Sequence, residues 1–166
     1  FVLRDLAAGE DLLIGGVAEF AFDKKGTRLA WVSDVDGKVG NGVSLRDLSS
    51  GVVRTLASGR ASFEKLAWAE EGDALAVLSG VEDKRFEDKV YSVIGFATLD
   101  RAQPRRVAYD PAKDTTFPAG MTISPNRAPE WTSDRSALLF GIHEPKEKTG
   151  DAEKAGGADK PAEGER

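Results

Sequence analysis

The sequence predicts an all-β chain that forms a partial β-propeller of about three four-stranded antiparallel blades, followed by a disordered C-terminal tail. Two observations lead to this prediction. One phrase recurs along the chain: an aromatic residue, a polar turn and then a run of apolar residues. Glycine and other turn residues also interrupt the chain at intervals of about 8–12 residues, a spacing typical of short strands.

The repeated phrase begins at Phe22, Trp68 and Trp131, at spacings of 46 and 63 residues. In the first two copies the polar turn ends in glycine, which adopts the left-handed backbone conformation readily, whereas the third copy has Arg135 there. The strands that follow, RLAWVS at 28–33 and ALAVLS at 74–79, contain unbroken apolar runs. Such runs predict strands that are covered on both faces.

A second phrase lies between these copies. VLRDLAAGE at 2–10 matches SLRDLSSGV at 44–52, 42 residues further on. Both read as a strand closed by a tight turn. We therefore expect strand three of the first blade at 43–48 and strand four at 52–56, and the next blade begins with FEKLAW at 63–68.

A sheet that copies of itself cover on both faces is the unit of a β-propeller, whose ring usually holds about four to eight blades. About three blades do not close such a ring, so the first and last faces need partners. We predict a partial propeller over 1–143, with repeats near 1–60, 61–110 and 117–143. A β-sandwich of about eight or nine strands is the second interpretation, because periodicity alone is compatible with it.

The last 23 residues, 144–166, are charged and contain no aliphatic side chain larger than alanine. Such a segment buries too little apolar area to offset the entropy of ordering it. We predict a disordered insertion or linker, which in a complete propeller would interrupt the third blade between its second and third strands.

Composition limits the classes of function. The chain of 166 residues has 40% apolar residues and a net charge of −5, which does not suit a nucleic-acid surface. No apolar run approaches the roughly 20 residues of a membrane span. The lack of cysteine excludes disulfides, thiolate catalysis and thiolate metal sites, and is compatible with a periplasmic, secreted or cytoplasmic location. Residues 1–6 do not read as a signal peptide.

The segments AFDKKGTRLAWVS at 21–33 and VSLRDLSSGVVRTL at 43–56 resemble the blade repeat of the prolyl oligopeptidase family and of the Tol-system propeller protein. FPAGMTISPNRAPEWTSDRSALLFGI at 117–142 resembles a blade of bacterial prolyl-oligopeptidase-like serine peptidases. The resemblance covers roughly 1–143. It implies a parent enzyme whose propeller caps an α/β-hydrolase domain with a Ser-His-Asp triad and selects the peptides that reach it. The partners would then be that domain, the remaining blades and a peptide substrate.

The chain itself lacks the residues of that chemistry. A nucleophile elbow reads Gly-x-Ser-x-Gly, and the nearest segment, Gly42–Arg46, lacks the second glycine. We predict no catalytic, cofactor-binding or metal-binding residue in this chain. We also expect neither nucleic acid nor a membrane to be a partner. The alternatives are a non-enzymatic propeller scaffold that binds another protein and, less favoured, a free-standing β domain.

Other candidate residues have plain structural interpretations. His143 is the only histidine and is expected at a strand end rather than in a triad. Asp34, Asp36 and Asn41 resemble part of a calcium loop, but the twelfth position is Leu45 where a glutamate is needed. In some of the resembling peptidases a pair of glutamates holds the amino terminus of the peptide. Glu70 and Glu71 form such a pair in sequence, but they are expected in a hairpin turn, so we do not assign this role to them.

The charged segment Val81–Tyr91 is expected to be a solvated loop, or, as the sharper hypothesis, part of a rim that touches a peptide or the hydrolase domain. Arg101, Arg105 and Arg106 are interpreted as strand-edge charge that discourages edge pairing. The tryptophans, Trp31, Trp68 and Trp131, are predicted to pack in the core, because two of them occupy the repeated aromatic position.

Overall fold

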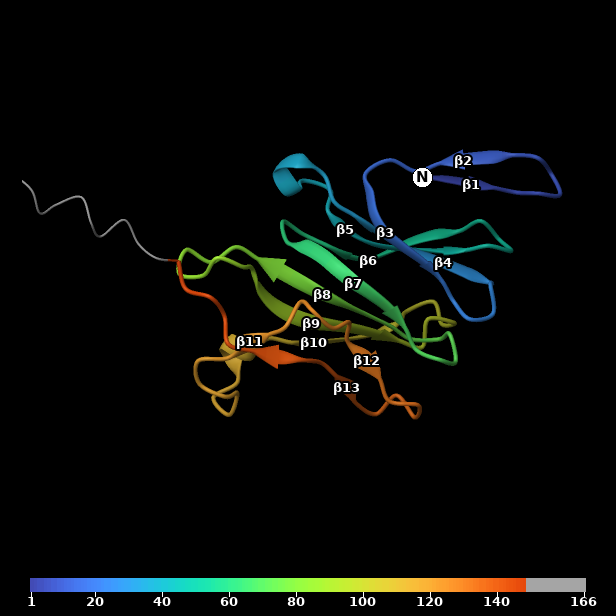
Figure 1. Ribbon diagram of the computed structural model, residues 1–166. Helices are drawn as coiled ribbons and strands as arrows, with labels where there is room; N and C mark the ends of the chain where they lie inside the picture. The colour runs from blue at the N-terminus through green and yellow to red at the C-terminus, as the bar shows by residue number, and fades with distance from the viewer. Residues whose placement is uncertain (149–166) are drawn as a thin grey trace, which may run out of the picture.

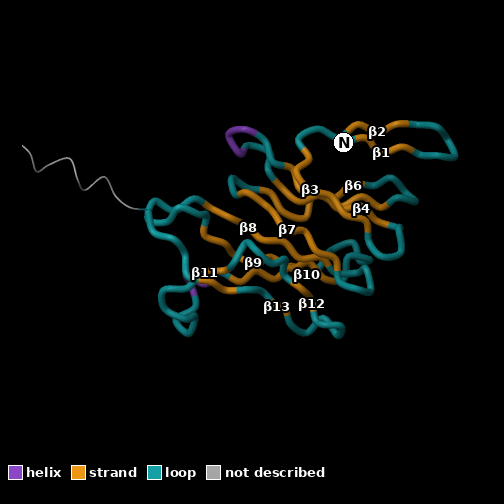
Figure 2. Tube along the Cα trace, in the orientation of Figure 1, coloured by secondary structure: helices purple, strands orange, loops and turns teal. Residues whose placement is uncertain are grey.

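The computed structural model describes residues 1–148 and consists almost entirely of antiparallel strands (Figures 1 and 2). Two sheets are complete and four-stranded, each with its strands side by side in chain order. The first sheet contains β3 (Val17–Phe22), β4 (Arg28–Ser33), β5 (Gly42–Asp47) and β6 (Val53–Ser58). The second contains β7 (Ser62–Trp68), β8 (Leu75–Val81), β9 (Val90–Ala97) and β10 (Arg105–Tyr109).

Two half sheets flank the complete ones. The strands β1 (Val2–Arg4) and β2 (Asp11–Leu13) pair only with each other, before the first sheet. After the second sheet, β11 (Thr122–Ile123) pairs with β14 (Ile142–His143), and β12 (Glu130–Trp131) pairs with β13 (Leu138–Leu139). Single 3-10 turns, η1 (Asp36–Lys38) and η2 (Pro111–Lys113), lie in loops. Within residues 1–148, no helix has the length and apolar character for a membrane crossing.

This arrangement confirms the all-β partial propeller with about three blades. Strand two of the first blade was predicted at 28–33, which is the range of β4. The proposed domain and repeat boundaries stay predictions; the sheets span 17–58, 62–109 and 122–143. Most of the predicted disordered tail, 149–166, lies outside the described residues. Its first residues are described, and they pair with the β8–β9 loop: Lys148 N donates to Arg85 O at 2.9 Å.

The repeated turns have one geometry. In the β3–β4 turn the N–H of Gly26 donates to Asp23 O at 2.9 Å, and Gly26 has φ of 66°. Gly72 has φ of 74° in the β7–β8 turn. In the β12–β13 turn the same place is taken by Arg135 with φ of 59°. The third turn thus keeps the left-handed conformation without glycine, and the guanidinium of Arg135 makes an ion pair with Asp73.

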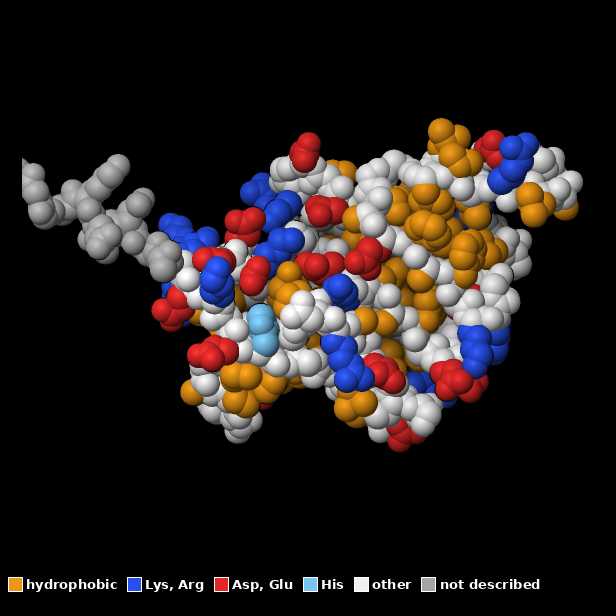
Figure 3. All heavy atoms as spheres, viewed as in Figure 1, with side chains coloured by type: hydrophobic (Ala, Val, Ile, Leu, Met, Phe, Trp, Pro, Cys, Tyr) orange, Lys and Arg blue, Asp and Glu red, His pale blue; other side chains and the backbone are white. Residues whose placement is uncertain are grey.

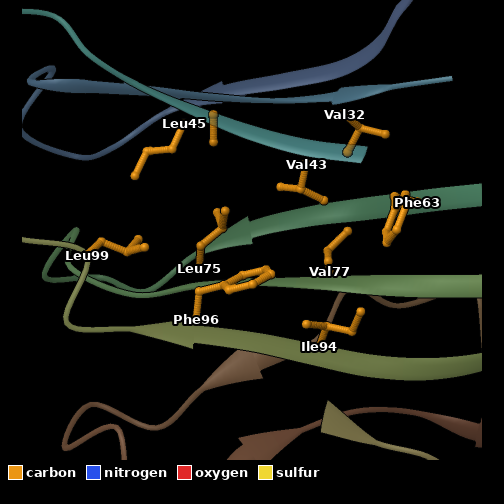
Figure 4. Close-up of a cluster of buried hydrophobic side chains, with 10 residues drawn as sticks. Val32, Val43, Leu45, Phe63, Leu75, Val77, Ile94, Phe96 and Leu99 are labelled. Carbon is orange, nitrogen blue, oxygen red and sulfur yellow. The ribbon is translucent and has the colours of Figure 1, made fainter. Parts of the chain in front are cut away.

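The core is an apolar layer between the two complete sheets (Figure 4). The first sheet contributes side chains of β4 and β5, and the second contributes larger ones from β7, β8 and β9. The members are Ala30, Val32, Val43, Leu45, Phe63, Leu75, Val77, Ile94, Phe96 and Leu99. All are at most 5% exposed, so water is excluded from the layer.

The second sheet is buried on its other face as well. Ala76 packs with Trp131, and Leu78 packs with Ile123. Both partners belong to the last hairpin, the name we use for the paired strands β11 to β14. The apolar run of β8 therefore faces two layers, which confirms the coverage of both faces predicted from its sequence.

The repeated tryptophans join successive blades. The indole Nε1 of Trp68, on the second sheet, donates to Ala21 O of the first sheet at 3.1 Å. Trp131 donates to Leu75 O at 3.1 Å, from the last hairpin to the second sheet. Trp31 and Trp131 are buried and Trp68 is partly buried, so the predicted packing role is confirmed.

Gly95 on β9 provides the space that seats Trp131. A Cβ atom at Gly95 would lie 2.6 Å from Trp131 Cζ2 and 2.7 Å from Leu138 Cδ1. Both contacts are far below van der Waals distance, and the Trp131 ring and the Leu138 side chain lie on the paired strands β12 and β13.

We predict that Gly95→Ala destabilises the chain by about 1–3 kcal/mol, the usual cost of overpacking a core. Urea unfolding followed by tryptophan fluorescence measures this change. Gly59→Ala is the control, because a Cβ atom there meets nothing within 4 Å. Equal unfolding free energies for the two variants would contradict the close seat of Trp131.

Candidate functional site

The loops that join the strands gather at two opposite ends of the sheets (Figure 1). We call the end with the tight turns 23–27, 69–73 and 132–136 the turn rim. The other end, with the longer segments 34–41, 82–89, 110–121 and 144–148, is called the loop rim.

Contacts between blades occupy the turn rim. A groove there is lined from the three tight turns and from the β9–β10 turn, by Asp23, Lys25, Thr27, Arg28, Glu71, Gly72, Asp73, Asp100, Ser133 and Arg135. Arg28 donates to Gly72 O at 3.1 Å, and Lys24 Nζ lies 2.9 Å from Glu70 Oε1. Glu70 and Glu71 lie in the hairpin turn, as predicted. The charged side chains of this rim therefore connect one blade to the next.

Asp23 holds the first of these turns. Its carboxylate is buried and accepts hydrogen bonds from Thr27 N at 2.7 Å, Thr27 Oγ1 at 2.8 Å and Arg28 N at 2.9 Å. The second turn has Ala69 at the same position and lacks this cap, whereas in the third turn Thr132 Oγ1 accepts from Ala137 N at 3.1 Å.

The segment that resembles a calcium loop is held by its own side chains. Asn41 is fully buried; its Nδ2 donates to Asp34 Oδ1 at 2.7 Å and to Ala61 O at 3.0 Å. Its Oδ1 accepts from Val35 N at 2.8 Å. Asp36 lies apart, in η1. Among residues 1–148, no cluster of three acidic or histidine side chains has the arrangement of a metal site.

A buried polar pair lies at the base of the loop rim. Tyr91 on β9 is 6% exposed, and its hydroxyl donates to Glu64 Oε1 of β7 at 2.8 Å. Lys89 Nζ lies 3.7 Å from the same carboxylate oxygen. Burial and the neighbouring Glu64 carboxylate raise the pKa of Tyr91 well above that of a free tyrosine. The phenol therefore stays protonated, and its hydrogen bond links β9 to β7 across β8.

The loop of the predicted charged segment, between β8 and β9, surrounds a hollow of about 290 Å³. It is lined by Glu82, Asp83, Phe86, Glu87, Asp88, Lys89, Tyr91 and Lys148. The Arg85 side chain and backbone N–H lower the pKa of Asp83 to about 2. Glu87 pairs with Lys146 at 2.6 Å, whereas Asp88 pairs with no cation within residues 1–148. Charged groups crowd this end in Figure 3. The hollow is acidic and can accept a positively charged group.

The remaining candidates lie in strands or at strand ends. Ser44 lies within β5. His143 ends β14, where its Nε2 is buried and has no hydrogen-bond partner in the described chain. Arg105 and Arg106 lie on β10, the edge strand of the second sheet, in agreement with their interpretation as edge charge. Arg101 lies in the preceding turn, where its carbonyl accepts from Arg54 at 2.7 Å.

Among the interblade contacts that sequence reasoning missed is that of Glu19. Its carboxylate on β3 accepts from Lys65 N at 2.9 Å and Leu66 N at 2.8 Å. These N–H groups point to Glu19 because β7 is irregular there, and Lys65 has φ of 61°. The 46-residue period places Glu19 and Lys65 at the same position of successive blades, which was the available signal.

Neither a protein family nor a curated protein matches the sequence. Among solved structures, Kuenenia stuttgartiensis hydrazine synthase is similar at a TM-score of 0.53 and 15% identity, over 84% of this chain and 42% of that one. TolB from Acinetobacter baumannii has a TM-score of 0.45 and 14% identity, over 84% of this chain and 31% of that one.

The β-propeller domain of the trilobed protease from Pyrococcus furiosus has a TM-score of 0.48 and 13% identity, over 89% of this chain and 47% of that one. This chain therefore spans less than half the length of each of the three. At 15% identity the likeness to hydrazine synthase concerns the fold alone.

The raised pKa of Tyr91 predicts a loss of stability in alkali. The pKa of Tyr91 is higher in the folded chain than the value of 10.0 in the unfolded chain. The resulting stabilisation of the folded chain is fully present below pH 10.0 and declines as the pH rises above it. In a Tyr109→Phe background, where Tyr91 is the only tyrosine, phenolate absorbance should appear well above pH 10. Adding Glu64→Gln should move it to lower pH. Titration of folded Tyr91 at or below pH 10 would contradict this prediction.

Proposed function

We propose that this chain is a propeller segment that selects peptides for a serine peptidase, whose α/β-hydrolase domain lies outside these residues. Peptide-bond hydrolysis is the function of that domain. This chain supplies stacked blades and a charged rim, and no residue of it is assigned a catalytic role.

The observation that carries the proposal is the acidic hollow of the loop rim. It combines side chains of the β8–β9 loop with Lys148, which follows the last hairpin. Asp88 and Glu82 are exposed there, and Glu82 reaches only Lys38 at 3.5 Å. Carboxylates around a concave place attract the amino terminus or a basic side chain of a peptide.

The blade phrases support the link to a peptidase. The segment 117–142, which resembles blades of bacterial prolyl-oligopeptidase-like peptidases, forms the last hairpin, and the charged segment that follows it begins on the loop rim. The rim that would meet a peptide is thus also the rim where the predicted charged insertion of this chain begins.

The coding frame beyond the codon for Arg166 tests the enzymatic part. A frame that continues through further blades into Gly-x-Ser-x-Gly, followed by Asp and His, would support the proposal. A frame that ends after further blades without this elbow would overturn it in favour of a propeller scaffold that binds another protein.

Binding of peptides tests the role of the loop rim in the chain itself. We predict that short peptides with a free amino terminus bind, and that Asp88→Asn combined with Glu82→Gln weakens binding about tenfold, since a hydrogen bond to a charged group contributes about 1.5–3 kcal/mol. Fluorescence anisotropy of labelled peptides measures this. The control is Glu70→Gln, which removes a similarly exposed carboxylate from the turn rim. Equal affinities for both variants would contradict the assignment.

A further inference from the structure

A groove of about 420 Å³ lies between the two complete sheets, on the side of their outer strands. It is lined from β6 of the first sheet, from the connection that follows β6, and from single residues of β7 to β10 of the second sheet. Its lining shares no residue with the groove of the turn rim or with the hollow of the loop rim. We call it the outer groove. Both sheets that form it are four-stranded, so it lies between two whole blades.

The apolar part of the outer groove is the margin of the core layer. Phe63 and Ile94 line the groove and are each 5% exposed, and Figure 4 shows them at the end of the layer opposite Leu99. Leu56 and Ala57 of β6 also line the groove; they are partly buried and pack against the same layer. An apolar side chain placed in the groove would extend this layer, and its removal from water would favour binding.

Two arginines give the outer groove a positive charge. Arg60 lies in the β6–β7 connection and Arg106 lies on β10, and both are exposed. Neither forms an ion pair within residues 1–148. The lining contains no carboxylate, although the chain has 28 acidic and 23 basic residues. The groove is therefore complementary in charge to an acidic ligand.

The strand β6 borders the outer groove with an open edge. It is the outermost strand of the first sheet and pairs only with β5 among residues 1–148. The N–H of Asp47 donates to Val52 O at 3.0 Å where the two strands begin to pair. By the alternation of an antiparallel ladder, the N–H and C=O groups of Val53 and Thr55 then point away from β5. These groups are in the direction in which a further strand would pair.

Charged side chains often protect the edges of sheets from pairing, and the two outer strands differ in this respect. The edge strand β10 carries Arg105 and Arg106. The one charged side chain of β6, Arg54, is directed to the second sheet, where it donates to Leu99 O at 2.6 Å and to Arg101 O at 2.7 Å. Because this guanidinium is held there, the edge of β6 is the one that is open to an added strand.

We propose that the outer groove binds an extended acidic segment of a partner protein, which pairs with the edge of β6 as a fifth strand. In strand addition the main chain supplies hydrogen bonds, and alternate side chains enter the groove beside the edge. Alternate residues of a strand share one face, so the segment has the pattern acidic-x-apolar-x-acidic. Its apolar side chain packs near Phe63 and Ile94, and its carboxylates pair with Arg60 and Arg106. This inference goes beyond the proposed function, in which a free amino terminus or a basic side chain binds at the loop rim.

Fluorescence anisotropy of a labelled peptide tests binding to the outer groove. The probe is Thr-Thr-Asp-Thr-Leu-Thr-Glu-Thr-Thr, acetylated at its amino terminus, so it offers the loop rim neither an amino group nor a basic side chain. Arg106→Ala should weaken binding about tenfold, because it removes a hydrogen bond between charged groups. Arg105→Ala is the matched control, since Arg105 is the exposed neighbour that points to the opposite face of β10. Equal affinities for the two variants, or no binding by the unaltered chain, would overturn the proposal.

N-methylation of the peptide tests the strand pairing and leaves the chain unaltered. A methyl group on one backbone amide at a time should abolish binding at alternate positions, where the N–H faces β6, and should spare the positions between them. The same effect at every position would overturn the pairing. Asp88→Asn combined with Glu82→Gln should leave the affinity for this peptide unchanged, so a failure of the proposed function is measured separately. A loss of binding in that double variant would overturn the outer groove as the site.

Discussion

The apolar layer between the two complete sheets is the interaction on which the rest of the structure depends. Short antiparallel strands are marginal on their own, and they persist when one face is removed from water. The layer joins residues far apart in the chain, such as Val43 of β5 and Phe96 of β9. It sets the two sheets face to face, and both rims follow from that arrangement, because every turn and loop lies at a strand end.

The other face of the second sheet is also covered by apolar side chains. Trp131 and Ile123 cover β8 there, so the last hairpin is held although its strands are only two residues long. The indole hydrogen bonds of Trp68 and Trp131 add direction to this packing, since each reaches a backbone carbonyl of the preceding sheet. The result is an arc whose first end face still exposes apolar side chains such as Phe20 and Phe22.

The two rims differ in structure because their charged groups have different partners. At the turn rim, short turns of one geometry lie close together, and cations such as Arg28 reach the neighbouring turn. At the loop rim the segments are longer, and local pairs such as Asp83 with Arg85 shape the β8–β9 loop. Asp88 has no such pair among the described residues.

The sequence by itself determined the strands, the tight turns and the blade repeat, because these follow from short-range rules. A buried run such as RLAWVS and a turn that ends in Gly26 are specified by neighbouring residues. Only the tertiary structure decided that Glu19 caps the irregular part of β7, that Tyr91 holds Glu64, and that residues 146–148 lie beside the β8–β9 loop. Each joins segments separated by 27 residues or more, and no local pattern specifies which distant groups packing brings together.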